Sequence, residues 1–159
     1  MNSQKVQPLD PQGKVVMDSD WGITTKKTMT FNGAVENDPG DESGTGNPAT
    51  LFTVTGTVLL RLLAICTTTL TGASATVEVG TVLITTGLIP LTTGTDIEVN
   101  EIWHDNAPDK SVELSSVLAE NIVSADVIQT VRTDDVDTGV IDYYAIWYPL
   151  SNGSSVEAA

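Results

Sequence analysis

The stretch from Phe52 to Cys66 constrains the fold more than any other part of the chain. Its sequence is FTVTGTVLLRLLAIC, in which apolar side chains recur at alternate positions. Successive side chains of a β-strand point to opposite faces, so this pattern predicts one long strand with a buried face. Gly56 lies inside the stretch, and we expect the strand to bend there.

Shorter segments with strand-like patterns follow, separated by turns rich in Gly, Asp and Asn. They are Thr76–Val79, Thr81–Thr85, Leu88–Thr92, Asp96–Trp103, Ser111–Leu118, Ile122–Arg132 and Gly139–Leu150. The segment Ser111–Asn121 is also compatible with one short helix. Thr, Val, Gly and Ser dominate the composition, as is typical of strands and turns. The sequence therefore predicts an all-β chain whose body is an antiparallel β-sandwich or a jelly-roll-like barrel.

Residues 1–49 have a different character and are predicted to form an extended N-terminal arm and linker, with residues 50–159 as the β-sandwich body. Four prolines and many glycines divide this segment into short pieces. Such a segment buries little apolar surface by itself, so we expect it either to be disordered or to lie across another surface, mobile in the free protein and ordered only on a neighbouring subunit or the capsid. The residues predicted to make this arm interface are Lys14, Val15, Val16, Trp21, Lys26 and Lys27.

The charge distribution argues against nucleic acid as a partner. The net charge is −14, of which residues 51–159 contribute −11, because that part of the chain contains three basic and fourteen acidic residues. A body of this sign repels phosphate, and no basic stripe is present. The longest apolar run, Val58–Cys66, contains Arg61 and is far too short to cross a bilayer. Neither a nucleic acid nor a membrane is therefore predicted as a partner.

No residue is predicted to have a catalytic, cofactor-binding or metal-binding role. His104 is the only histidine, and the acids near it in sequence are Glu101, Asp105 and Asp109. A metal site would need further ligands that converge from elsewhere in the chain. Cys66, the only cysteine, lies on the apolar side of its strand and is predicted to be a core residue. The chain is therefore not expected to be an enzyme or to bind a cofactor.

The acidic segments at residues 37–42 and 133–138 do not match the spacing of a calcium-binding loop. They are interpreted as solvated turns.

Aromatic residues are dense only near the end of the chain, at Tyr143, Tyr144, Trp147 and Tyr148. On a strand, Tyr144 and Tyr148 share one face, and Tyr143 and Trp147 share the other. A strand that is apolar on both faces is either central in a sandwich or part of a subunit interface. These four residues are predicted to form the interface of a homo-oligomer, and a platform for stacking sugars is the alternative.

Four blocks of the body carry a resemblance to a known group of proteins. They are FTVTGTVLLRLLAICTTTLTGASATVEVG, TDIEVNEIWHD, SSVLAENIV and GVIDYYAIWYPLS. In these blocks the chain resembles small virion structural proteins of tailed bacteriophages. The resemblance implies a capsid decoration or cement protein, assembled in the host cytoplasm and located in the virion. It further implies a homotrimer that binds the major capsid protein through an N-terminal extension. The alternative is a carbohydrate- or receptor-binding module of a head or tail fibre.

Overall fold

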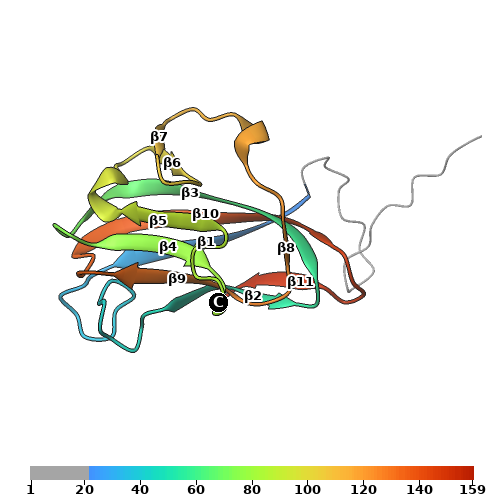
Figure 1. The fold of residues 1–159 in the computed structure, drawn as a ribbon, viewed down its shortest axis with the longest axis horizontal. Helices are drawn as coiled ribbons and strands as arrows, with labels where there is room; N and C mark the ends of the chain where they lie inside the picture. The colour runs from blue at the N-terminus through green and yellow to red at the C-terminus, as the bar shows by residue number, and fades with distance from the viewer. Residues whose placement is uncertain (1–21) are drawn as a thin grey trace, which may run out of the picture.

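The computed structural model describes residues 22–159 and shows two antiparallel β-sheets packed against each other (Figure 1). The predicted fold class, an all-β sandwich, is confirmed. The strands are β1 Ile23–Phe31, β2 Ala49–Thr55, β3 Val58–Thr71, β4 Thr76–Gly80, β5 Ile89–Thr93, β6 Glu101–Trp103, β7 Asp109–Lys110, β8 Asn121–Val123, β9 Val127–Arg132, β10 Thr138–Pro149 and β11 Ser155–Ala158. Two 3-10 turns, η1 Gly94–Asp96 and η2 Ser115–Val117, lie between strands.

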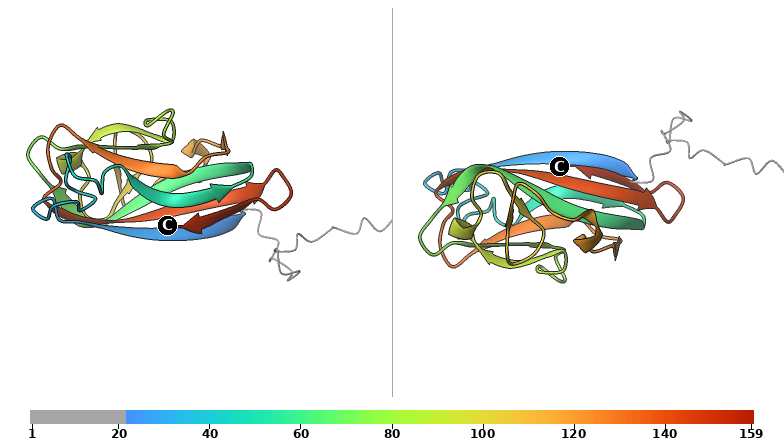
Figure 2. Two further views of the ribbon diagram at one scale, coloured as in Figure 1. Left: turned by 90° about the horizontal axis from the view of Figure 1, so that it is seen from below. Right: turned by 90° about the horizontal axis from the view of Figure 1, so that it is seen from above.

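The two sheets form the two layers of the sandwich (Figure 2). The first sheet has the order β1-β10-β3-β6-β7, with β8 also paired to β3, and the second has the order β11-β2-β9-β4-β5. β1 and β11 contact each other at one side. β5 lies at the other side, where the loop that precedes it meets β8 across a surface hollow.

The core lies between the sheets and is lined by alternate residues of the two longest strands. Along β3, the residues from Val58 to Cys66 at every second position are buried, and the residues between them are half-buried. β10 pairs with β3 and follows the same alternation. Cys66 is only 1% exposed, so its predicted place in the core is confirmed.

The single strand predicted at Phe52–Cys66 is wrong, because the chain passes from one sheet to the other at Gly56. β2 belongs to the five-stranded sheet and β3 to the six-stranded sheet. Gly56 has φ +68°, and a Cβ atom there would lie 2.6 Å from Oγ of Ser151. This backbone conformation and this close approach favour glycine. The strand therefore does not bend at Gly56 but ends beside it.

Several other predicted strands also differ from the observed ones. Ile122–Arg132 is divided between β8 and β9, and Thr81–Thr85 is a loop. The segment predicted at Ser111–Leu118 is mostly irregular and contains η2, so neither a strand nor a full helix forms. β11 was not predicted. These segments are short, and turn residues and neighbouring strands decide their conformation more than their own pattern does.

The predicted boundary at residue 49 is wrong, because β1 is an integral strand of the body. It pairs with β10 over nine residues, from Ile23 opposite Trp147 to Phe31 opposite Gly139. Phe31 is buried at its end. The sequence of β1 lacks a clear apolar–polar alternation because polar residues occupy some of its inward positions. Thr25 is one of them, and its hydroxyl donates to the carbonyl oxygen of Val156 at 2.8 Å.

The loop between β1 and β2 is also fixed to the body. The Gly33 amide donates to the Val136 carbonyl at 2.9 Å, and the Val136 amide donates to the Gly40 carbonyl at 2.9 Å. The Asn47 side chain accepts from the Val131 amide and donates to the Val131 carbonyl, as a neighbouring strand would. Residues 32–48 are therefore part of the folded domain rather than a linker.

Candidate functional site

Two of the four aromatic residues predicted at an oligomer interface belong to the core instead. Tyr143 is fully buried, and its hydroxyl donates to Oε1 of Gln129 at 2.6 Å. Its ring contacts Trp103 edge to face, with 6.3 Å between ring centres. Trp147 is 6% exposed, and its Nε1 donates to Oγ1 of Thr25 at 3.1 Å. This corrects the interface assignment of Tyr143 and Trp147.

Tyr144 and Tyr148 point away from the core and lie half-buried on the outer surface of the six-stranded sheet. Lys26 crosses this surface from β1. Its Nζ lies 5.6 Å from the centre of the Tyr144 ring and 2.7 Å from Oδ2 of Asp142. The pKa of Lys26 is raised, chiefly by the hydrogen bond to Asp142. The outward side of β10 therefore carries two tyrosines next to one ion pair.

Neighbouring strands continue this surface with apolar residues. Strand register places Leu63 opposite Tyr144 and Leu59 opposite Tyr148, and partners in register share a face. The surface is here named the outer apolar face. Its members are Leu59, Leu63, Ile65, Ile102, Ile122, Val140, Tyr144, Ile146 and Tyr148. The solvent side of an antiparallel sheet is usually polar, so this face has the composition of a surface that becomes covered.

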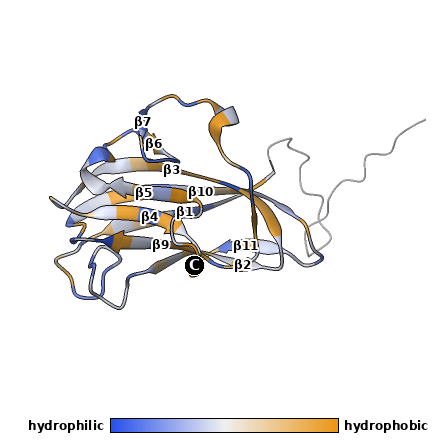
Figure 3. Cartoon of the chain, in the orientation of Figure 1, coloured by the Kyte–Doolittle hydropathy of each residue, from blue (hydrophilic) through white to orange (hydrophobic). Residues whose placement is uncertain are grey.

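A second apolar surface lies at the side of the sandwich where β5 and β8 are found. Val82, Leu83 and Ile84 are 73%, 88% and 62% exposed on the loop between β4 and β5. This surface is here named the apolar edge, and it consists of residues 82–84 with Leu88, Val117 and Ile122. In Figure 3, parts of the segment from η2 to β8 are orange, the colour of hydrophobic residues.

Two hollows run along the apolar edge. One of about 320 Å³ lies between the loop before β5 and residues 121–125, and one of about 270 Å³ lies between Leu88, Val117 and His104. Leu88 and Asn121 line both. Ile122 is 73% exposed and belongs both to this edge and to the outer apolar face, where it pairs with Leu59. The two apolar surfaces therefore meet at Ile122.

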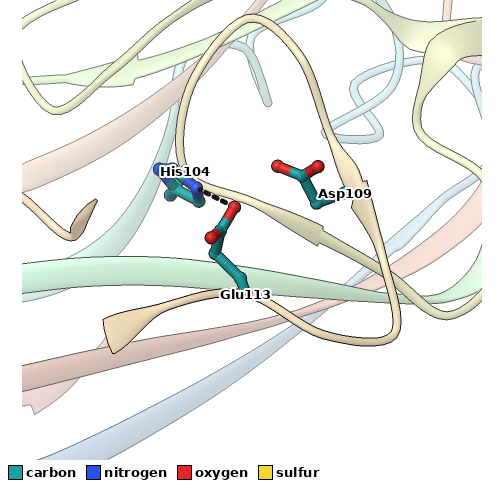
Figure 4. A group of neighbouring side chains, drawn as sticks. All are labelled: His104, Asp109 and Glu113. Carbon is teal, nitrogen blue, oxygen red and sulfur yellow. Dashed lines mark hydrogen bonds and ion pairs between the residues drawn. The ribbon is translucent and has the colours of Figure 1, made fainter. Parts of the chain in front are cut away.

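His104 lies in a cluster with Asp109 and Glu113 (Figure 4). His104 follows β6, and Asp109 begins the returning strand β7. Nε2 of His104 is 3.2 Å from Oε2 of Glu113, and one ligand atom from each residue lies within 4.8 Å of the others. Asp105 also approaches His104, with Oδ2 3.9 Å from Nδ1. Glu113 was not among the sequence candidates, and Glu101 is buried apart, accepting the Glu98 amide at 2.7 Å.

The two carboxylates of this cluster affect each other. A hydrogen bond from Asp109 to Glu113 raises the pKa of Asp109, since it favours the protonated form. The pKa of Glu113 is lowered, first by the Leu114 amide, which donates to its carboxylate, and then by Asp109 and His104. No lysine or arginine among residues 22–159 forms an ion pair with Asp109 or Glu113. The cluster thus joins two carboxylates and one imidazole.

The acidic loop at residues 37–42 uses its carboxylates on its own backbone. Asp38 accepts amide hydrogens from Asn32 and Gly40 at 2.7 and 2.9 Å. Asp41 accepts from the Asn37 and Ser43 amides at 3.0 and 3.1 Å. These bonds, that from Asn37 foremost, lower the pKa of Asp41. The two carboxylates therefore stabilise the conformation of the loop by accepting hydrogen bonds from its own backbone amides.

The residues predicted at an arm interface, and the single cysteine, remain to be placed. Lys14, Val15, Val16 and Trp21 lie outside the described residues. Lys26 and Lys27 lie in β1, so their assignment to a free arm is wrong: Lys26 pairs with Asp142, and Nζ of Lys27 donates to the Ala159 carbonyl. Cys66 donates to the Thr68 carbonyl at 3.1 Å, and burial raises the pKa of its thiol to about 11.

Comparison with family models, with curated proteins and with solved structures finds no match to this chain. Among residues 22–159, the only helical turns are three residues long, and none is a candidate to span a bilayer.

Proposed function

We propose that this chain is a non-enzymatic structural protein that associates with copies of itself, as a trimer, and decorates the capsid of a tailed bacteriophage. The observation that carries the first part is the outer apolar face together with the apolar edge. The decoration role, the major capsid protein as partner and the location in the virion rest on the resemblance of the four sequence blocks.

The apolar edge favours association because it lacks charge, whereas the outer apolar face, which adjoins it at Ile122, carries Arg61 opposite Ile146 and the Lys26–Asp142 ion pair. From Val79 to Thr95 the chain has no charged residue, in a molecule with a net charge of −14. Copies of the same negative charge repel each other, so the electrostatic cost of contact is lowest where the surface has no acidic residues. Burial of apolar side chains stabilises a contact by about 25 cal/mol for each Å² removed from water. The apolar edge is where both conditions are met.

The state of association in solution tests this proposal. The mass of the full chain at micromolar concentration is measured by sedimentation, alongside two variants. Ile122→Asp places a charge where the two apolar surfaces meet, and we expect it to produce monomers. Val35→Asp makes the same kind of change at a 52% exposed residue of the β1–β2 loop, and we expect it to leave the oligomer intact. A monomeric parent chain, or an oligomer that is insensitive to Ile122→Asp, contradicts the proposal.

The capsid part needs a separate experiment. Particles assembled without this chain are mixed with the full chain, and the bound fraction is measured by sedimentation and imaging. We expect saturable binding with symmetric occupancy. If the oligomer forms but does not bind particles, the proposal of self-association stands and the proposal of capsid decoration is rejected.

The second candidate function, glycan binding, is favoured by one observation. Tyr144 and Tyr148 have partly exposed rings on one side of β10. They are four residues apart, a separation of about 13 Å at the rise of a strand. Aromatic rings on a flat sheet surface are suited to stacking against sugars. Saturable binding to a glycan array that is lost in Tyr148→Ala would favour this function over decoration.

A further inference from the structure

We propose that His104, Asp109 and Glu113 bind one divalent transition-metal ion. This site is independent of the proposed capsid role, and it concerns the segment between β6 and η2. One imidazole nitrogen and two carboxylate oxygens are a donor set that suits zinc and its neighbours, whereas calcium and magnesium are bound by oxygen ligands alone.

The fold brings the three residues together from two directions. Trp103 is fully buried and its Nε1 donates to Oγ1 of Thr92 at 2.9 Å, so the chain is anchored immediately before His104. Asp109 stands opposite Ile102 in the β6–β7 pairing. Ser111 then has φ +65°, which turns the chain so that Glu113 returns toward the histidine (Figure 4).

The spacing of the donor atoms is close to what a metal ion requires. For metal–ligand bonds of about 2.1 Å, neighbouring ligands of a tetrahedral site lie about 3.4 Å apart. His104 Nε2 and Glu113 Oε2 are 3.2 Å apart, and no pair in the cluster exceeds 4.8 Å. Asp109 is exposed and already contacts Glu113 through a hydrogen bond, so a small rotation of its side chain would bring its carboxylate to the spacing of a ligand. Positions left open in the coordination sphere are available to water.

Burial of the histidine gives the cluster an orientation. The His104 side chain is 8% exposed and the Glu113 side chain 18%, while the ring edge with Nε2 faces the carboxylates. Nδ1 faces Asp105, whose other oxygen is held by the Ala107 amide at 2.7 Å. At 3.9 Å this contact is longer than a hydrogen bond, so it is only electrostatic. Nε2 is the ring nitrogen nearest the Glu113 carboxylate and is therefore the one offered to an ion.

The charges around the cluster also favour a cation. Two carboxylates approach each other beside the imidazole ring, and Lys110, the nearest lysine in sequence, pairs with Glu98 at 2.8 Å instead. Arg61, from β3, pairs with Glu120. Among the described residues, the charge of the cluster is therefore compensated by no basic side chain other than His104 itself. A divalent cation would provide that compensation.

The single histidine makes a direct test possible. The full chain is stripped with a chelator, labelled with ¹⁵N, and titrated with Zn²⁺ while the ring nitrogens of His104 are observed by NMR. We expect one zinc per chain, a large shift confined to Nε2, and a higher melting temperature. Ca²⁺ in the same titration should leave the ring signals in place. A ring that does not respond to Zn²⁺, or that responds equally to Ca²⁺, overturns the proposal.

Variants locate the ion. Removing a partner of a metal ligand commonly weakens binding tenfold or more, so loss of a ligand should cost at least roughly tenfold in zinc affinity. We expect this loss in both Asp109→Asn and Glu113→Gln. Glu98→Gln, an acid of the same region that pairs with Lys110, should bind zinc like the parent chain. Asp109 is exposed, so its variant should fold even where one at His104 does not. Unchanged affinity in Asp109→Asn and Glu113→Gln would place the zinc elsewhere and reject the site.

Discussion

The two sides of β10 carry the same kinds of residue but have different surroundings. On the inner side, Tyr143 and Trp147 are packed between the sheets and each has a hydrogen-bond partner. On the outer side, Tyr144 and Tyr148 are half-buried among aliphatic residues of neighbouring strands. The comparison shows that apolar character identifies both a core and a contact surface. What distinguishes them is the second sheet, which covers only one side.

The largest effect expected concerns the strand that borders β10. Deleting residues 1–49 removes β1, exposes the edge of β10 and leaves the inner side without Met29 and Phe31. We expect no cooperative unfolding transition in this variant. A chain lacking only residues 1–21 keeps every described strand and is the control. A cooperative transition in the shorter chain would show that β1 is dispensable.

The next prediction compares the two sides of β10 directly. Tyr143→Ala leaves a large cavity and an unpaired Gln129, so we expect it to lower the free energy of unfolding by about 3–5 kcal/mol. Tyr144→Ala removes a half-buried ring and should cost no more than about 1.5 kcal/mol, because little cavity forms. Denaturant unfolding measures both. Equal costs would mean that the outer side is also core.

A smaller effect is expected at the β1–β2 loop, which satisfies its own polar groups. The pKa of Asp41 is lowered from the ordinary value of 3.8, so its contribution to stability is present above that value and is lost as pH falls through the lowered pKa. The melting temperature of Asp41→Asn should therefore approach that of the parent chain as the solution is acidified. Asp137→Asn, at an exposed residue directly before β10, is the control, and the same pH-dependent convergence of melting temperatures in that variant would contradict the prediction.

The smallest effect is expected at Cys66. Its thiol pKa is raised by burial from 9.0 to about 11, so the stability that burial of the neutral thiol provides is complete below pH 9 and is lost as pH rises toward 11. At neutral pH, Cys66→Ala should cost only about 1 kcal/mol of packing. A thiol reagent should modify the folded chain only when denaturant is added. Rapid modification in its absence would show that the residue is accessible.

Strong alternation made part of this fold predictable from sequence. The buried Cys66 follows from residues that repeat at period two, and the strand at Gly139–Leu150 follows from its run of β-branched and aromatic residues. The division of Phe52–Cys66 does not follow, and the reason is geometric. Phe52 and Val58 both face the interior that the two sheets share, so alternation continues across Gly56 although the strand does not. The alternation of apolar residues therefore indicates which side chains are buried, but not to which sheet each strand belongs.

Features built from polar residues were harder to foresee. β1 hides its period because Thr25 and Lys27 take inward positions near an edge, where Lys27 reaches the Ala159 carbonyl. The cluster at His104 depends on Glu113, nine residues away, and on the backbone turn at Ser111. Such convergence depends on one dihedral angle, for which the sequence provides no periodic signal.

The nine-residue register between β1 and β10 also has a mechanical consequence. Ile23, where β1 begins, stands opposite Trp147, close to the end of β10, so the two strands run side by side along almost their whole shared length. A tether that pulls on Gly22 along the axis of β1 would load all rungs of this ladder at once in shear. Hydrogen bonds loaded together resist force better than bonds that open one after another. Tension applied there along β1 would therefore be shared by the whole β1–β10 ladder.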